Sequence, residues 1–206
     1  MKITWLGHSC FKVGSQGCQI VLDPYEDGSV PGLRPVREQA DQVLCSHGHG
    51  DHCGTECVTL RQGAPGRIAV EALHTWHDDR QGALRGPNAI HILDDGQCRI
   101  AHLGDLGCDL SPEQKEKLCG LTALLIPVGG YYTIDAVQAK RLADELAPTV
   151  VVPMHYRQEG VGFEVIGTVD KFTKLCDDVV VYSGSELEIT PQTVRQTAVL
   201  LPENMG

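Results

Sequence analysis

Three histidines and one aspartate lie within the six residues from His47 to His52, in the sequence Ser46-His47-Gly48-His49-Gly50-Asp51-His52. Imidazole nitrogens and a carboxylate oxygen suit Zn²⁺, and also Mn²⁺ or Fe²⁺. The glycines between them let the backbone turn sharply. The alternative, surface histidines bonded to water, is more typical of single histidines than of such a cluster. The stretch therefore predicts a metal site.

The elements on either side of this stretch predict where it lies in a fold. Residues 40–45 form a short apolar run bounded by polar residues, which predicts a buried strand. Residues 54–61 are interpreted as the start of a helix. The cluster is therefore expected on a turn between a strand and a helix at a sheet edge, where functional sites are common.

Composition restricts the class of protein and its partners. The chain has 206 residues, of which 42% are hydrophobic and 21% charged, so one globular domain over residues 1–206 is expected. Its 27 acidic and 17 basic side chains leave a net charge of −10. An acidic surface repels phosphate backbones, so long nucleic acid is not expected as a partner.

The ends and cysteines of the chain point to the cytoplasm. The amino-terminal residues show no secretion signal, and no apolar run approaches the roughly 20 residues that span a bilayer, so no membrane association is expected. Nine cysteines without a Cys-x-x-Cys pair are interpreted as reduced thiols. Cys45 and Cys53 flank the metal cluster, but core packing is favoured over a role in the site or in oxidation.

The rest of the chain predicts mixed strands and helices. Residues 25–37, with two prolines and two glycines, predict a long loop, which is expected to border the substrate entrance. An Asp-Asp-Gly joint at residues 94–96 predicts a hairpin within 85–103. Strands are expected at 2–6, 9–13, 18–22, 67–73, 121–127, 149–152, 178–182 and 186–189, and helices from Ser111, at 134–146 and at 167–175.

Further polar side chains follow predicted strands. Asp105 follows one strand and His155 another, while His102, by strand alternation, points away from Asp105 and is interpreted either as structural or as a support for the metal ligands. His8 is a weaker candidate because it is a single histidine in a turn. Arg85 has the planar fork that suits a phosphate or carboxylate, but pairing with Asp78 or Asp79 is an equal alternative.

The His-x-His-x-Asp-His pattern resembles the signature of the metallo-β-lactamase-fold hydrolases. The resemblance implies an α/β fold, a four-layer αββα sandwich of two mixed β-sheets with helices outside. Four further segments are similar to a small cytoplasmic branch of hydrolases related to ascorbate-6-phosphate lactonase. They are Trp5-Leu6-Gly7-His8, Arg85-Gly86-Pro87-Asn88, His102-Leu103-Gly104-Asp105 and Pro153-Met154-His155.

The resemblance also implies a site with two ions, most simply zinc, and a hydroxide between them. Of His74 and His77, it favours His77 as a ligand. Asp51 would orient the hydroxide or receive its proton, Asp23 would support a metal-binding histidine, and His8, Arg85, Tyr131 or Tyr132 would contact substrate. The implied ligands are His47, His49 and His77 for one ion, Asp51, His52 and His155 for the other, and Asp105 as a bridge.

These implications favour a metal-dependent hydrolase of a small, anionic ester, lactone or phosphodiester. His49 stands where the oxygen-reducing diiron branch carries glutamate, and the chain has no room for the helical domain of glyoxalase-type thiolester hydrolases. The alternative is a catalytically silent module of the same fold that binds metal and serves in regulation or binding. The sequence leaves open whether the chain forms a homo-oligomer.

Overall fold

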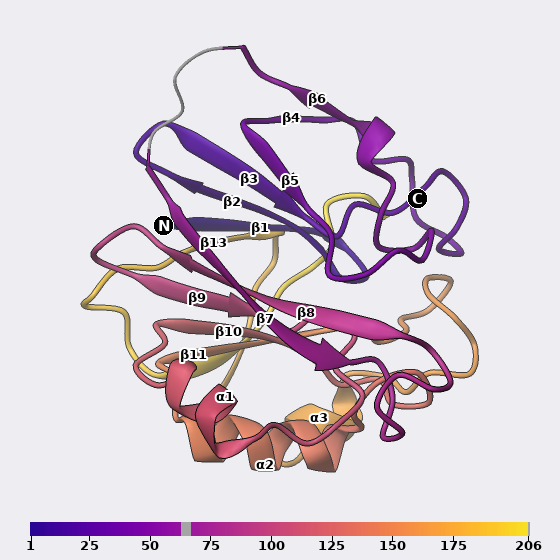
Figure 1. Ribbon diagram of the computed structural model, residues 1–206, viewed down its shortest axis with the longest axis vertical. Coiled ribbons are helices and arrows are strands. Elements are labelled where there is room, and N and C mark those ends of the chain that lie inside the picture. The colour runs from indigo at the N-terminus through magenta and orange to yellow at the C-terminus, as the bar shows by residue number, and fades with distance from the viewer. Residues whose placement is uncertain (63–66, 206) are drawn as a thin grey trace.

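The computed structural model describes residues 1–62 and 67–205 of the chain. Two β-sheets face each other (Figure 1). The smaller sheet has the order β13-β1-β2-β3-β5, with β1 (Lys2–Gly7), β2 (Cys10–Ser15), β3 (Cys18–Leu22), β5 (Gln42–Leu44) and β13 (Glu186–Glu188). β1, β2 and β3 are antiparallel neighbours, as their apolar runs and intervening turns predict.

The larger sheet has the order β12-β14-β11-β10-β9-β8-β7. It contains β7 (Ala69–Trp76), β8 (Pro87–Asp94), β9 (Arg99–His102), β10 (Ala123–Pro127), β11 (Val150–Met154), β12 (Val179–Val181) and β14 (Gln196–Val199). β7, β8 and β9 are antiparallel, which confirms the hairpin at residues 94–96, and the remaining neighbours are parallel. β14 lies where the sequence predicts no strand.

Helices α1 (Pro112–Lys117), α2 (Ala136–Leu146) and α3 (Asp170–Thr173) lie on the outer side of the larger sheet (Figure 1). Ser111 and Gln114 form the capping box that the sequence predicts for α1. The buried residues of α2 include the predicted apolar stripe, Ala139, Leu142, Ala143 and Leu146. α3 is shorter than the helix predicted at 167–175.

The outer side of the smaller sheet is built differently from the predicted helical layer. Residues 54–61 form a short 3₁₀-helix, η1 (Thr55–Cys57), and β6 (Val58–Leu60), which pairs with β4 (Glu38–Ala40). The expectation of a helix here is wrong, because Val58 and Thr59 are β-branched and find strand partners in β4. No α-helix of residues 1–62 and 67–205 lies on this side (Figure 1).

These short elements cover a second apolar cluster. It consists of Leu6, Cys10, Val21, Tyr25, Val30, Val36, Ala40, Cys57 and Val58. The α/β class and the two facing sheets agree with the predicted metallo-β-lactamase-like fold, while strands and the 25–37 loop take the place of helices outside the smaller sheet.

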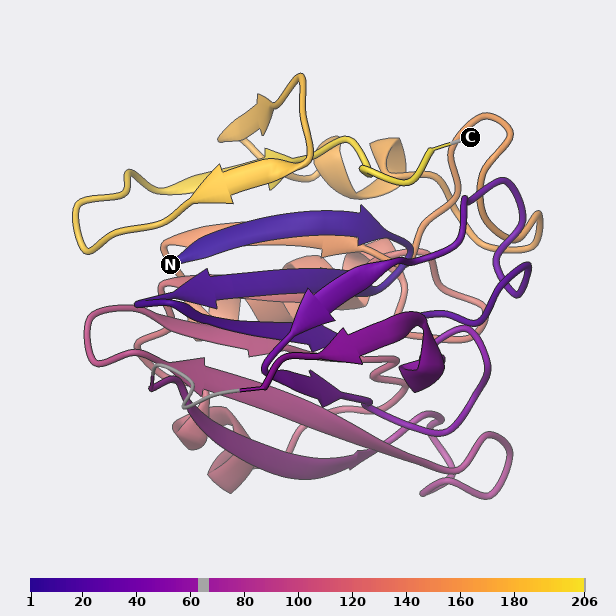
Figure 2. The ribbon, with the colours of Figure 1, turned by 90° about the horizontal axis from the view of Figure 1, so that it is seen from above.

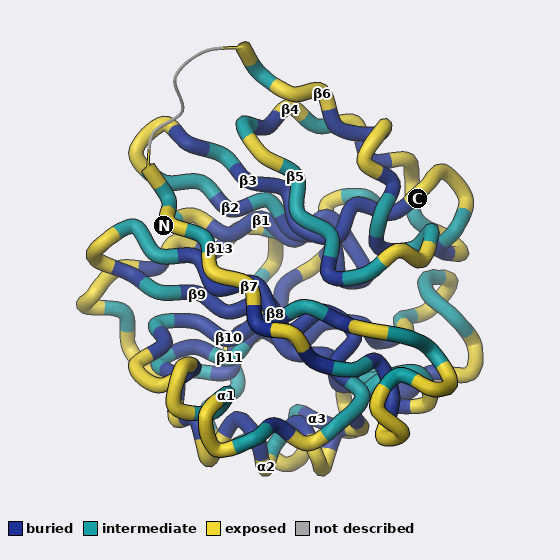
Figure 3. Tube along the Cα trace, in the orientation of Figure 1, coloured by how far each residue is buried: buried dark blue, intermediate teal, exposed yellow. Residues whose placement is uncertain are grey.

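The main core contains buried apolar side chains from both sheets. Trp5 and Phe11 of the smaller sheet belong to the same cluster as Ile90 and Leu125 of the larger one. Figure 3 shows buried residues along the strands and exposed residues mainly in loops and on the helices. All nine cysteines are free thiols; Cys45 and Cys53 are half-buried rather than core residues. Within the described part of the chain, no helix has the length and apolarity needed to cross a bilayer.

The carboxy-terminal segment joins the two sheets. After β12, the chain crosses to the smaller sheet as β13, which pairs with β1, and returns to the larger sheet as β14. Figure 2 shows this yellow segment beside the indigo β1. At the other end of β1, the backbone N–H of His155 donates to the carbonyl of His8 over 3.2 Å. The loops that follow β1 and β11 are therefore held together.

Candidate metal centre

Each predicted ligand lies in a loop that directly follows a strand. The 46–52 turn follows β5, His77 follows β7, Asp105 follows β9 and His155 follows β11. These loops gather at one edge of both sheets, on the right in Figure 1. The fold therefore brings together the ligands that the sequence predicts far apart along the chain.

Asp105 lies at the centre of this group and is almost completely buried. Its Oδ1 atom lies 3.2 Å from Nε2 of His52. Its Oδ2 atom lies 3.3 Å from Nε2 of His77 and 3.2 Å from Nε2 of His155. The two carboxylate oxygens thus face histidines from three different loops, as a bridging ligand requires.

The potential ligand atoms form three overlapping groups, in each of which they lie within 4.8 Å of one another. One group is His47, His49 and His77, and a second is His8, Asp51, His52 and His155. The third, His47, His52 and Asp105, joins the other two. His49 is exposed, whereas His8, His52 and His155 are buried. One end of the cluster therefore opens to solvent and the other is enclosed.

Asp23 supports this cluster through hydrogen bonds to residues of the 46–52 turn. Its Oδ2 accepts hydrogen bonds from Nδ1 of His52, over 2.7 Å, and from the hydroxyl of Ser46, over 2.6 Å. The Ser46 hydroxyl also lies 3.0 Å from Nδ1 of His47. Because its hydrogen goes to Asp23, Nδ1 of His47 is the donor in that bond. Both histidines are thus held with Nε2 free to bind a metal, an arrangement that raises ligand basicity.

Asn88 positions Asp105, and sequence reasoning assigned it no role. Its side chain donates to Oγ1 of Thr75 over 2.8 Å and to the carbonyl of Leu103 over 3.0 Å, and it accepts from the backbone N–H of Asp105 over 3.0 Å. Gly104, with φ of +55°, allows this approach, since an added Cβ would lie 2.4 Å from Oδ1 of Asn88. A polar asparagine near the start of β8, within the segment Arg85-Gly86-Pro87-Asn88, was the available signal.

Gly50 of the ligand turn is required by close packing rather than by an unusual dihedral angle, whereas Gly48 has open space around it. Neither Gly48 nor Gly50 has a positive φ. A Cβ at Gly50 would lie 2.8 Å from a carboxylate oxygen of Glu26, and the carbonyl of Gly50 accepts from the N–H of Glu26 over 2.7 Å. The turn therefore packs closely against the segment that follows Asp23.

Several site residues have a left-handed backbone that is uncommon for residues other than glycine. They are His8, with φ of +54°, Asp23, with +46°, and His155, with +52°. Such conformations cost about 1 kcal/mol or more each and concentrate at functional sites. They turn the chain sharply at the strand ends, which directs the side chains into the cluster.

The charges of the cluster are matched to a bound cation. Burial and the neighbouring His52 lower the pKa of His47 to about 3, and burial and His155 lower the pKa of His8 to about 4. Burial opposes ionisation of Asp105, but His155 and His52 hold its pKa well below the usual range. Burial also opposes protonation of His52, yet Asp105 and Asp23 raise its pKa well above normal. The carboxylates of Asp23 and Asp105 therefore favour a positive charge at the centre of the cluster, beside His52.

Unpaired polar atoms show that the residues fit a metal ion. Among the described residues, no hydrogen-bond partner meets Nε2 of His8, His47, His52 and His155 or Oδ1 of Asp105, although all are buried. Buried polar atoms are normally hydrogen-bonded, and an ion is one explanation when they are not. Imidazole and carboxylate are the donors that zinc accepts.

The remaining histidines are separated from the cluster. His74, the alternative to His77, is exposed and lies edge-on to the ring of Trp76. His102 donates from Nε2 to the carbonyl of Ser9 over 2.8 Å and accepts at Nδ1 from the N–H of Gly104 over 3.1 Å. His102 thus links the loop after β1 of the smaller sheet to the loop after β9 of the larger sheet, which is a structural role.

A cavity of about 390 Å³ opens beside the cluster. Ser29, from the 25–37 loop, lines it, as do Arg85, Tyr132 and Phe163. Tyr131 is not among the lining residues, and its side chain is 66% exposed. The other lining residues belong to the cluster or its turn: His49, Gly50, Asp51, His77 and Asp105.

The fold and this histidine and aspartate cluster together define a class, the metal-dependent hydrolases of the metallo-β-lactamase type. A family model described as a beta-lactamase superfamily domain matches residues 2–155, and the chain belongs to this superfamily. That range includes every predicted ligand.

Relatives with a known assignment agree. A UPF0173 metal-dependent hydrolase of Archaeoglobus fulgidus is 30% identical over 76% of this chain and 83% of its own length. A UPF0173 metal-dependent hydrolase of Carboxydothermus hydrogenoformans is 29% identical over 76% of this chain and 84% of its own length. A Thermotoga maritima structure, described as a candidate Zn-dependent hydrolase of the metallo-β-lactamase superfamily, has 33% identity and a TM-score of 0.74, with 97% of each chain covered. This chain is a metal-dependent hydrolase of that superfamily.

Proposed function

We propose that this protein uses two zinc ions to hydrolyse a small anionic ester, lactone or phosphodiester. The division of the cluster into two groups, joined by His47, His52 and Asp105, is the observation that carries the proposal. His47, His49 and His77 would hold one ion, Asp51, His52 and His155 the other, and Asp105 would bridge them. The imidazole-rich donor set supports zinc, as does the assignment of the Thermotoga maritima relative.

Bound ions would supply Lewis acidity and lower the pKa of a coordinated water to about 7. Asp51 would act next to them. Its Oδ2 lies 3.4 Å from Nε2 of His8 and 3.7 Å from Nε2 of His52. Burial opposes its ionisation, but His8 and His52 lower its pKa below the ordinary value, so the carboxylate is ionised at neutral pH. The ionised carboxylate would therefore accept a hydrogen bond from the attacking water and orient it, and we propose that it also receives the proton once the water is activated.

The cavity sets the kind of substrate. Its volume of about 390 Å³ suits a small molecule. The net charge of −10 makes the chain repel large polyanions, whereas a small anion can still reach the ions and Arg85. The resemblance to relatives of ascorbate-6-phosphate lactonase supports the inclusion of lactones and phosphate esters.

The test is hydrolysis of a panel of esters, lactones and phosphodiesters by purified, zinc-loaded protein. We expect turnover that chelation abolishes, and we expect Asp51→Ala to lower kcat by at least about 100-fold while circular dichroism stays unchanged. Asp144→Ala, on the exposed side of α2, is the matched control. Unchanged turnover in Asp51→Ala would rule out the mechanism. A zinc-loaded wild type without turnover on the whole panel would favour the catalytically silent module.

A further inference from the structure

Arg85 presents an unneutralised positive charge to the cavity. Its guanidinium donates from Nη2 to the carbonyl of Tyr131 over 3.1 Å, and its Cζ lies 5.5 Å from the centre of the Tyr132 ring. Among residues 1–62 and 67–205, no carboxylate lies within ion-pair distance of this guanidinium. In a chain with 27 acidic and 17 basic residues, such a cation beside a ligand cavity requires a reason.

Asp78 holds the loop that carries Arg85 and does not neutralise the guanidinium. Its buried carboxylate accepts four backbone N–H groups, from Arg80 and Gly82 at Oδ1, over 2.8 and 2.9 Å, and from Leu84 and Arg85 at Oδ2, over 3.0 and 2.8 Å. The sequence alternative, pairing of the Arg85 side chain with Asp78 or Asp79, is therefore wrong. Instead, backbone N–H groups of residues 80–85 surround the carboxylate of Asp78, and Asp78 directly follows the predicted ligand His77.

The wall beside Arg85 is aromatic. The rings of Tyr132 and Phe163 meet edge-on, with centroids 6.0 Å apart, and the Phe163 ring meets that of His8 at 5.5 Å. Phe163 and Tyr132 both line the cavity. A planar or unsaturated group could stack there while its charged end reaches Arg85, because aromatic faces and edges favour such contacts.

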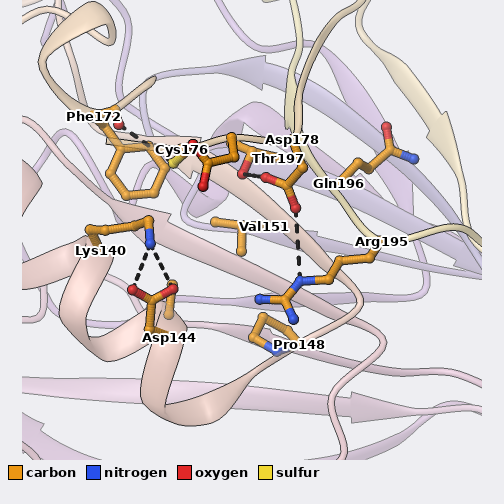
Figure 4. A pocket seen from close by; sticks show the side chains of 12 residues that line it. Lys140, Asp144, Pro148, Val151, Phe172, Cys176, Asp178, Arg195, Gln196 and Thr197 are labelled. Atoms are coloured by element: carbon orange, nitrogen blue, oxygen red, sulfur yellow. Dashed lines mark hydrogen bonds and ion pairs between the residues drawn. The ribbon is translucent and has the colours of Figure 1, made fainter. Parts of the chain in front are cut away.

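A second cavity differs from the one beside the metal cluster, because its positively charged side chains are paired with carboxylates. It has a volume of about 260 Å³ and lies between α2, α3 and β14 (Figure 4). Its cations are paired within the wall, Lys140 with Asp144 and Arg195 with Asp178 (Figure 4). Of these two cavities, only the one beside the metal cluster therefore combines an aromatic wall with a guanidinium that lacks a carboxylate partner among the described residues.

We propose that Arg85 is the specificity residue for the substrate and binds an oxyanion, a carboxylate or phosphate, of a compact molecule whose flat part packs on Tyr132 and Phe163. The scissile bond would then face Asp51 and Asp105. Asp78 is the positioning residue that holds Arg85 in place. This inference rests on the proposed function, and it adds the chemical group that the cavity selects.

Two esters with the same leaving group test the role of Arg85 in turnover. The mono-p-nitrophenyl ester of glutaric acid carries a terminal carboxylate, and p-nitrophenyl valerate is its neutral counterpart. We expect Arg85→Gln to raise KM for the glutarate ester by about 10- to 100-fold, with kcat within threefold, and to leave KM for the valerate ester unchanged. Arg80→Gln, on the same loop but exposed, is the control. Equal losses on both esters would overturn the assignment.

Asp78→Asn tests the positioning residue. An amide cannot accept four N–H groups as a carboxylate does, because its nitrogen is a donor. We expect a higher KM for the glutarate ester alone, because a displaced Arg85 does not affect a neutral substrate. A loss of kcat on both esters, with a lower melting temperature, would show that Asp78 serves only stability.

Binding without turnover separates this inference from the proposed function. Calorimetric titration with benzoate and with benzyl alcohol compares an aromatic anion with its neutral counterpart. We expect the wild type to bind benzoate at least ten times more tightly than benzyl alcohol, and Arg85→Gln to remove that difference. If neither ester is hydrolysed, the proposed function fails for these esters, but the titration still decides the role of Arg85. Equal benzoate affinity in wild type and Arg85→Gln would overturn it.

Discussion

Nδ1 of His52 lies 2.7 Å from Oδ2 of Asp23, while Nε2 of the same ring faces Oδ1 of Asp105 at 3.2 Å. His52 is therefore held between a supporting carboxylate and a predicted bridging one. Asp23 directly follows β3 and Asp105 lies in the loop after β9, so this one ring connects the two sheets.

Asp23→Asn should weaken metal binding without removing a ligand. The amide is a poorer acceptor for the N–H of His52 and for the hydroxyl of Ser46, so both His52 and His47 lose orientation and basicity. We expect zinc affinity to fall by about 10- to 100-fold, measured by competition with a chromophoric chelator. Asp27→Asn, at an exposed position of the 25–37 loop, should leave the affinity unchanged. An unchanged zinc affinity in Asp23→Asn would contradict the supporting role of Asp23.

Asn88→Ala should reduce stability and loosen Asp105. The substitution leaves the carbonyl of Leu103 and the N–H of Asp105 without this partner, whereas Oγ1 of Thr75 keeps its hydrogen bond to the backbone carbonyl of residue 88. We expect the free energy of unfolding to fall by about 1–3 kcal/mol per group left buried and unpaired, measured by denaturant titration. Asn204→Ala, whose side chain bonds Tyr25 away from the cluster, is the comparison. If Asn88→Ala lowers the free energy of unfolding by less than Asn204→Ala does, water replaces the hydrogen bonds of the Asn88 side chain.

Removal of metal should destabilise the folded protein. Without ions, Asp51 and Asp105 remain buried or half-buried carboxylates beside unpaired imidazoles. Zinc at 1,000 times its dissociation constant should stabilise the fold by about 4 kcal/mol for each independent site, seen as a higher melting temperature. Calcium at the same concentration is the control, since it prefers oxygen ligands. Equal melting temperatures with and without zinc would contradict a bound ion in the cluster.

Asp95 should contribute stability that depends on pH. It accepts from the hydroxyl of Ser15 over 2.6 Å and from two backbone N–H groups, which lower its pKa below the ordinary 3.8 although burial opposes this. Because the folded pKa is the lower one, the contribution is complete above the unfolded pKa and is lost as the pH falls through the folded value. Asp95→Asn should therefore cost about 0.5–1.5 kcal/mol at neutral pH and progressively less below pH 3.8.

Chemical denaturation at several pH values measures this difference. Asp79→Asn, an exposed carboxylate on another loop, is the control for the change in net charge. A constant difference between wild type and Asp95→Asn from pH 7 to pH 3 would contradict the assignment, because the interaction would then not depend on ionisation.

The sequence by itself determined the features that depend on neighbouring residues. His47, His49, Asp51 and His52 are close in the chain, so any tight turn brings them together. The stripe of α2 and its capped start follow from helical periodicity and from hydrogen bonds over three residues. The antiparallel strands β1 to β3 follow in the same way from short apolar runs and turns.

Only the tertiary structure decided which distant residues join the cluster. β7 extends to Trp76, beyond the predicted end at residue 73, so His74 lies within the strand and His77 just after it. His8 faces Asp51 through a contact between the loops that follow β1 and β5, and Asn88 of β8 holds Asp105 in the loop after the neighbouring β9. Within residues 54–61, Val58–Leu60 form a strand because β4 offers a pairing partner. Such choices depend on long-range contacts and burial, which local patterns do not encode.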